Sequence, residues 1–116
     1  MESILTTVKK MLGIPEDYDA FDDQLIMYIN SVLSVLRQLG VGNSIFRITG
    51  STETWNQLIA TEDDLDVDEV QTYVYMKVRL LFDPPTNSVV MDALKQSIAE
   101  FEYRLNLQAD DSMETE

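Results

Sequence analysis

The chain has 116 residues, 45% of them hydrophobic, and 21 acidic against 8 basic residues give it a formal charge of −13 at pH 7. This length suits a single domain, and no apolar run approaches the roughly 18 residues of a membrane-spanning helix, which excludes an integral membrane protein. The negative charge disfavours binding to nucleic acids and anionic membranes, because both require a cationic surface.

The first part of the chain predicts two amphipathic helices. Apolar residues recur at helical spacing over residues 4–12, and Gly13 and Pro15 supply the usual stop. The lysines of this segment follow its apolar residues, so it does not read as a signal peptide and export is not expected. A longer helix follows the acidic stretch 19–23 and ends at Gly40 and Gly42. Its apolar face consists of Leu25, Ile29, Val32, Leu36 and Leu39.

The middle of the chain predicts irregular structure. Residues 43–51, NSIFRITGS, mix β-branched residues with glycine, which suits a loop or a short β-hairpin better than a helix. Ser51 or Thr52 is expected to cap a brief helix that carries Trp55, before the acid-rich link around residues 60–66.

Two further helices are predicted around a Pro-Pro turn. The first, over about 67–82, is apolar almost all the way round, so we expect another subunit to provide part of its cover. Pro84 and Pro85 end it, because proline lacks a backbone N–H and restricts the residue before it. Thr86, Asn87 or Ser88 then caps the last helix, which completes a long helix hairpin.

The predicted fold class is therefore all-α: a small bundle of about four main helices, with an irregular or short β-hairpin loop in the middle. Residues 1–108 form a single helical domain in this interpretation. After Leu107 the apolar period is lost, which predicts an acidic, flexible C-terminal tail over residues 109–116.

No group of residues predicts catalysis, a cofactor or a metal. The chain has neither cysteine nor histidine, which excludes thiolate chemistry and every nucleophile that depends on histidine. Asp64, Asp66 and Asp68 have the spacing of a calcium loop, but Glu69 stands where that loop needs glycine and Tyr75 where it needs glutamate. We expect no catalytic, cofactor-binding or metal site, and no enzyme.

A small set of residues in and before the apolar helix is the candidate interface with another subunit or partner. Lys77 and Arg79 lie in the most apolar helix, where they either extend to solvent from a partly buried position or pair with carboxylates of a neighbouring subunit. Trp55 is either a core residue or an interface anchor. The candidate interface residues are Trp55, Tyr73, Tyr75, Lys77 and Arg79.

Residues 77–106, KVRLLFDPPTNSVVMDALKQSIAEFEYRLN, resemble head-tail connector proteins of tailed bacteriophages, also called adaptor or head-completion proteins. The resemblance implies a structural virion protein at the head-tail interface, made in the host cytoplasm. It implies a homo-oligomeric ring, dodecameric in the virion, that joins the portal protein to a stopper, head-closure or tail protein. DNA passes through such a ring without sequence-specific binding, and no membrane is involved.

The resemblance also implies that terminal and loop segments become ordered when they dock on the portal. The tail from Ala109 and the loop 43–51 are the candidates for that contact. The alternative is a small acidic phage protein that mimics DNA and inhibits a host nucleic-acid enzyme. Such a mimic needs carboxylates at phosphate-like spacing on one face, whereas the acids here cluster at the ends of predicted elements.

Overall fold

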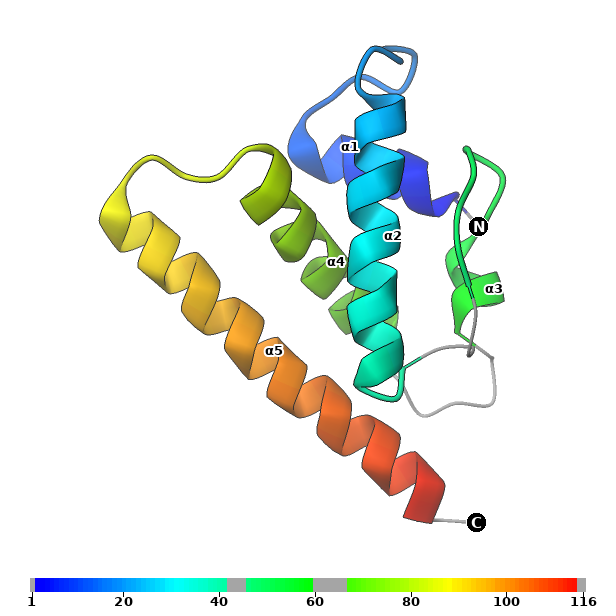
Figure 1. Cartoon of the computed structure of the whole chain (residues 1–116), viewed down its shortest axis with the longest axis vertical. Coiled ribbons are helices and arrows are strands. Elements are labelled where there is room, and N and C mark those ends of the chain that lie inside the picture. The colour runs from blue at the N-terminus through cyan, green and yellow to red at the C-terminus, as the bar shows by residue number, and fades with distance from the viewer. Residues whose placement is uncertain (1, 42–45, 60–66, 115–116) are drawn as a thin grey trace.

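The chain folds as a set of helices, and the all-α prediction is confirmed. The computed structural model describes residues 2–41, 46–59 and 67–114, without the side chains of residues 108–114. Within this part the helices, in chain order, are α1 (Ile4–Leu12), α2 (Asp22–Gln38), α3 (Trp55–Leu58), α4 (Val67–Phe82) and α5 (Ser88–Glu114), as Figure 1 shows.

Helix α4 lies at the centre of the arrangement. It packs against α1, α2 and α5, while α5 runs as one long rod along the side of the molecule (Figure 1). The result is a flat body with extents of 44 by 35 by 19 Å. A thin body of this kind leaves much of each long helix at or near the surface.

Both ends of α1 carry the expected stop signals. The Ser3 hydroxyl caps the N-terminus by accepting a 3.1 Å hydrogen bond from the Thr6 backbone N–H. At the other end Gly13 adopts the left-handed conformation with φ of 81°, and its N–H bonds back to the last turn. Glycine takes this conformation without the steric cost that a Cβ would add, so the predicted stop at Gly13 is confirmed.

The segment before α3 is held against α2 and α1 by hydrogen bonds. Asn30 of α2 acts like a strand partner for Ile48: its side chain accepts from the Ile48 N–H at 2.8 Å and donates to the Ile48 carbonyl at 3.0 Å. Over residues 46–54 the chain forms no strand, apart from an isolated antiparallel bridge between Ser3 and Thr54. Residues 43–45 of the predicted loop lie outside the described residues.

The predicted cap of α3 was wrong. Thr54, and not Ser51 or Thr52, is the N-cap, and it forms a reciprocal capping box with Gln57 in which the Thr54 N–H donates to Gln57 Oε1 at 2.9 Å. The capping box requires a Gln or Glu three residues after the cap, and only Thr54 has one at the start of this helix. Helix α3 therefore begins at Trp55, and the side chain of Trp55 points into the core.

The turn between α4 and α5 begins where proline chemistry predicts it. Helix α4 ends at Phe82, and Asn87 caps α5 by accepting hydrogen bonds from the N–H groups of Val89 at 2.8 Å and Val90 at 3.2 Å. Asn87 is thus the cap among the three candidates. Helix α5 continues to Glu114, so its backbone is helical beyond Leu107, where the apolar period ends. The division into a domain and a tail stays a prediction.

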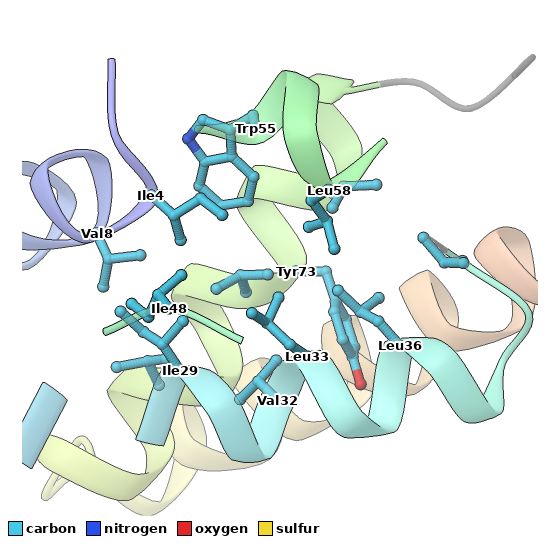
Figure 2. Packing of buried hydrophobic residues seen from close by; sticks show 14 of the residues in the cluster. Ile4, Val8, Ile29, Val32, Leu33, Leu36, Ile48, Trp55, Leu58 and Tyr73 are labelled. Carbon is cyan, nitrogen blue, oxygen red and sulfur yellow. The ribbon is translucent and has the colours of Figure 1, made fainter. Parts of the chain in front are cut away.

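The core includes side chains from all five helices, Ile98 and Leu105 of α5 among them, and Figure 2 shows how some of these side chains meet. Trp55 and Leu58 of α3 approach from one side, Ile29 and Leu36 of α2 from the other, with Tyr73 of α4 among them. The residues of α4 that are buried within the single chain are Val70, Tyr73, Val74, Met76 and Val78. The same chain therefore supplies part of the cover of α4, while Leu81 remains 48% exposed.

Candidate assembly surface

Two of the five candidate interface residues, Trp55 and Tyr73, lie in the core. Both side chains have 0% of their surface exposed. The Trp55 indole N–H donates a 3.0 Å hydrogen bond to the Thr7 hydroxyl of α1, which satisfies its one polar group. Direct contact of either residue with another subunit would require the chain to rearrange, so both act first as packing residues.

Tyr73 also joins α4 to α5 through a polar contact. Its hydroxyl donates a 2.7 Å hydrogen bond to Glu102 Oε2, and the Lys77 ammonium lies 3.7 Å from the same oxygen. Burial, and then the hydrogen bond to the Glu102 carboxylate, raise the pKa of the Tyr73 hydroxyl well above its usual value. The Glu102 carboxylate of α5 therefore contacts two side chains of α4.

Tyr75, Lys77 and Arg79 retain part of their surface. The Arg79 guanidinium donates to the Tyr75 hydroxyl at 3.3 Å, a contact within α4, and both residues are partly buried. Lys77 already has Glu102 of its own chain as an ionic partner. The prediction that Lys77 and Arg79 pair with a neighbouring subunit is not tested by a single chain and stays a prediction.

Arg104 of α5 forms a second polar link to α4 that the sequence analysis missed. Its guanidinium lies 3.4 Å from Glu69 of α4 and 3.6 Å from Glu100 one turn earlier on α5. It also stacks over the Phe101 ring at 4.5 Å from the ring centre. The i, i+4 spacing of Glu100 and Arg104 predicts their ion pair from the sequence. The contact with Glu69 depends on how α4 and α5 pack, which the spacing does not show.

Lys9 is a second residue that the sequence analysis missed. Only 3% of its side chain is exposed; its ammonium contacts Asp22 of α2 at 2.9 Å and donates to the Glu16 carbonyl at 2.9 Å. The available signal was its place four residues after Leu5, on the apolar face of α1. A buried lysine needs such partners, so this pair fixes the segment that connects α1 to α2.

Exposed apolar side chains gather where the α1–α2 segment meets the end of α4. The Phe21 ring packs edge-on against Phe82 of α4 with centroids 5.2 Å apart, and Tyr18 lies 5.6 Å from Phe21. Beyond the turn, Val89 and Val90 of α5 are 75% and 46% exposed. Exposed apolar surface of this kind is common at protein contacts, but these residues carry no feature that identifies a partner.

A groove on α2 is lined by basic residues, although the chain as a whole is acidic. It has a volume of about 390 Å³ and lies between α2, the segment 46–47 and α3; we call it the α2 groove. Two arginines, Arg37 and Arg47, line it together with neutral polar and apolar side chains, and no acidic residue is among those lining the groove in the described part of the chain. The remaining lining residues are Met27, Asn30, Ser31, Leu33, Ser34, Phe46 and Leu58.

Within residues 2–41, 46–59 and 67–114 no three His, Cys, Asp or Glu side chains come together as a metal site would require, and Asp64 and Asp66 lie outside these ranges. No helix within these ranges is long and apolar enough to cross a bilayer.

A comparison with known protein families places the chain beside phage proteins. The sequence model of a family described as phage connector protein matches residues 4–112, which extend from the first residue of α1 into the last turns of α5. No curated protein matches the chain, and no solved structure matches it.

Proposed function

We propose that this chain, which belongs to the phage connector protein family, forms a ring that joins the portal to the stopper or tail components of a tailed phage. Membership makes it a structural bacteriophage head-tail connector that interacts with other phage head and tail components. The observation that carries the proposal is the extent of the family match, because residues 4–112 include almost the whole described fold.

The pairing of α4 and α5 supports the role of a rigid connecting element. Helix α4 ends at Phe82, the two prolines follow, and α5 begins at Ser88. Polar contacts join the two helices at two places along their length. Glu102 contacts Tyr73 and Lys77, and Arg104 contacts Glu69. In the proposed connector the Pro-Pro turn and these ties hold a rigid helix hairpin in a fixed position between two larger rings.

The charge of the chain supports the passage of DNA through such a ring. A formal charge of −13 on every subunit repels phosphates, so a channel built from these subunits does not retain the duplex. The proposed ring contains twelve copies, as the resemblance of residues 77–106 implies. Its place is the virion, after assembly in the host cytoplasm, and the role requires no catalytic group or cofactor.

Part of the predicted interface is accessible for contacts between subunits of the proposed ring. Tyr75, Lys77 and Arg79 have surface available, and we propose that they contact another subunit. Reversing the charge of Lys77 and Arg79 together should then weaken ring assembly, and unchanged assembly would exclude their role. The loop 43–51 and the chain from Ala109 remain the proposed contacts with the portal.

The first test is the native mass of the purified chain, alone and mixed with purified portal of the same phage, by light scattering after size-exclusion chromatography. The proposal predicts a discrete complex whose added mass equals a whole-number ring of chains on each portal. A chain that elutes separately from the portal at every mixing ratio would refute portal binding.

A further inference from the structure

We propose that the cluster of Tyr18, Phe21 and Phe82, which we call the aromatic patch, is the docking site for the component on the tail side of the proposed ring. The partner that fits the patch is a protein segment that combines basic with apolar side chains. The inference rests on the proposed connector function. It adds the surface that meets the stopper, which is separate from the contacts proposed above with other subunits and with the portal.

The aromatic patch joins two parts of the chain that are far apart in the sequence. Phe21 immediately precedes α2, and its ring meets the ring of Phe82, the last residue of α4, edge-on with centroids 5.2 Å apart. Tyr18 extends the patch, with its centroid 5.6 Å from that of Phe21. Tyr18 and Phe21 are 48% and 38% exposed, so solvent reaches both rings although they already pack together. Rings that their neighbours hold in place lose little side-chain freedom when a partner covers them, which favours binding.

The chain around the aromatic patch carries only negative charge. Residues 11–36 and 80–94, which supply the three rings, contain seven acidic and no basic residues. The aspartates adjoining the rings in sequence, Asp17, Asp19 and Asp83, are exposed, and among the described residues none of them forms an ion pair with a basic side chain. Exposed rings alone do not identify a partner, but this charge does. Arginine and lysine side chains can pair with the carboxylates and also stack on the rings.

The aromatic patch lies away from both proposed portal contacts. The Asn106 side chain donates a 3.1 Å hydrogen bond to the Leu39 carbonyl, so α5 runs past the C-terminal end of α2 toward Ala109. Phe21 stands at the other end of α2, and the 17 residues of that helix put about 25 Å between its ends. Figure 1 shows the link between α1 and α2 at the top and the end of α5 at the bottom. The described part of the loop 43–51 is held to the middle of α2 by hydrogen bonds.

A subunit that bridges two components needs a separate surface for each of them. With the portal contacts placed on the loop and beyond the end of α5, the aromatic patch remains available for the second component. A second copy of this chain suits the patch less well, because each copy has only 8 basic against 21 acidic residues. The complementary charge is therefore expected on a different protein.

Photo-cross-linking identifies what covers the aromatic patch. Tyr18 is replaced by p-benzoylphenylalanine, which keeps an aromatic side chain there, and the labelled chain is irradiated in a mixture with purified portal and stopper of the same phage. We expect a covalent product of the chain with the stopper. The matched control carries the same label in place of Tyr103, which is 66% exposed on α5 outside the patch. A complex of all three proteins in which position 18 reacts with the portal, with a second copy of the chain or with nothing would overturn the inference. An equal yield of stopper product from both positions would do so as well.

Substitutions at exposed positions measure the chemistry of the contact. Asp19→Lys should weaken binding of the stopper to the portal–chain complex about tenfold or more, because it replaces attraction for basic side chains with repulsion. Tyr18→Ala should also weaken this binding, because it removes an exposed ring of the patch. The controls Glu100→Lys and Tyr103→Ala make the same changes on exposed positions of α5 and should leave stopper binding close to that of the unmodified chain. Stopper binding that Asp19→Lys leaves unchanged, or that Glu100→Lys weakens equally, in variants with unchanged helicity, would contradict the docking site.

The two proposals fail in different ways. An unmodified chain that does not bring the stopper to the portal refutes the connector function and, with it, the docking site. A chain that bridges portal and stopper normally, while position 18 yields no stopper product, leaves the connector function intact and removes the docking site alone.

Discussion

Tyr73 of α4 donates a 2.7 Å hydrogen bond to Glu102 of α5, and this contact links the core of the protein to its longest helix. The Tyr73 side chain is fully buried near Leu33 of α2 and Leu58 of α3 (Figure 2), while its hydroxyl reaches the partly exposed carboxylate of Glu102. Lys77 adds a 3.7 Å ion pair to the same carboxylate. The position of α5 therefore depends in part on Tyr73, a residue whose ring belongs to the core.

Tyr73→Phe tests this link. The variant keeps the buried ring, removes the hydrogen bond and leaves Glu102 with Lys77, so the free energy of unfolding should fall by about 1–2 kcal/mol. Urea unfolding followed by circular dichroism measures it. Tyr75→Phe is the control, because its hydroxyl accepts a hydrogen bond from Arg79 on the same helix. Equal stability of Tyr73→Phe and the unmodified chain would show that the contact with Glu102 contributes nothing.

Trp55→Phe separates a core role from an interface role. The smaller ring loses the 3.0 Å bond to Thr7 and leaves a cavity in the centre of the fold, which should lower the unfolding free energy by about 1–3 kcal/mol. Thr7→Val keeps the Trp55 ring and removes the hydroxyl, which accepts from Trp55 and also donates to the Ser3 carbonyl, so it should cost less than Trp55→Phe. If Trp55→Phe leaves the stability of the isolated chain unchanged and weakens assembly, the core role of Trp55 is wrong.

Asn87→Ala tests the start of α5. Asn87 satisfies the N–H groups of Val89 and Val90, so its loss should cost about 1 kcal/mol of stability. Asn87→Ser keeps a side-chain acceptor and should stay close to the unmodified chain. Thermal unfolding of the three proteins under one condition makes the comparison. A Ser variant as unstable as the Ala variant would exclude side-chain capping as the cause.

Glu53 makes stability depend on pH. Desolvation raises the pKa of Glu53, but hydrogen bonds from the Thr49 N–H and hydroxyl, each 2.9 Å, outweigh it and lower the pKa from its ordinary 4.5. A carboxyl with a lowered folded-state pKa contributes stability above its unfolded pKa and loses it as pH falls through the folded value. Glu53→Gln should therefore be less stable than the unmodified chain by about 1 kcal/mol at pH 7, with the difference vanishing in acid. A difference that is the same at pH 7 and pH 3 would contradict this account.

The sequence predicted local structure well where one residue type determines it. Gly13 ends α1 because a left-handed residue is required there, and Pro84 and Pro85 prevent α4 from continuing after Phe82. Asn87 was one of three candidate caps, since Thr86 and Ser88 have similar capping chemistry and only the backbone path distinguishes them. The cap of α3 was missed because the Gln57 half of the capping box was not weighed.

Features that depend on packing between distant segments were not predictable in the same way. The Lys9–Asp22 pair, the contact of Arg104 with Glu69 and the α2 groove each combine residues from separate elements. The sequence identified Tyr73, Lys77 and Trp55 as significant but could not show that one chain supplies most of their partners. Apolar residues around a central helix indicate burial on several sides, and they do not show which molecule provides it.

The most direct test of the connector function is whether this chain bridges two components that do not otherwise bind. Purified portal and purified stopper of the same phage are mixed with and without the chain, and the composition of the portal peak is measured by light scattering and gel densitometry. We expect the stopper to join the portal only when the chain is present, in a fixed ratio of chain to portal. Stopper that binds the portal equally well without the chain would contradict the connector function.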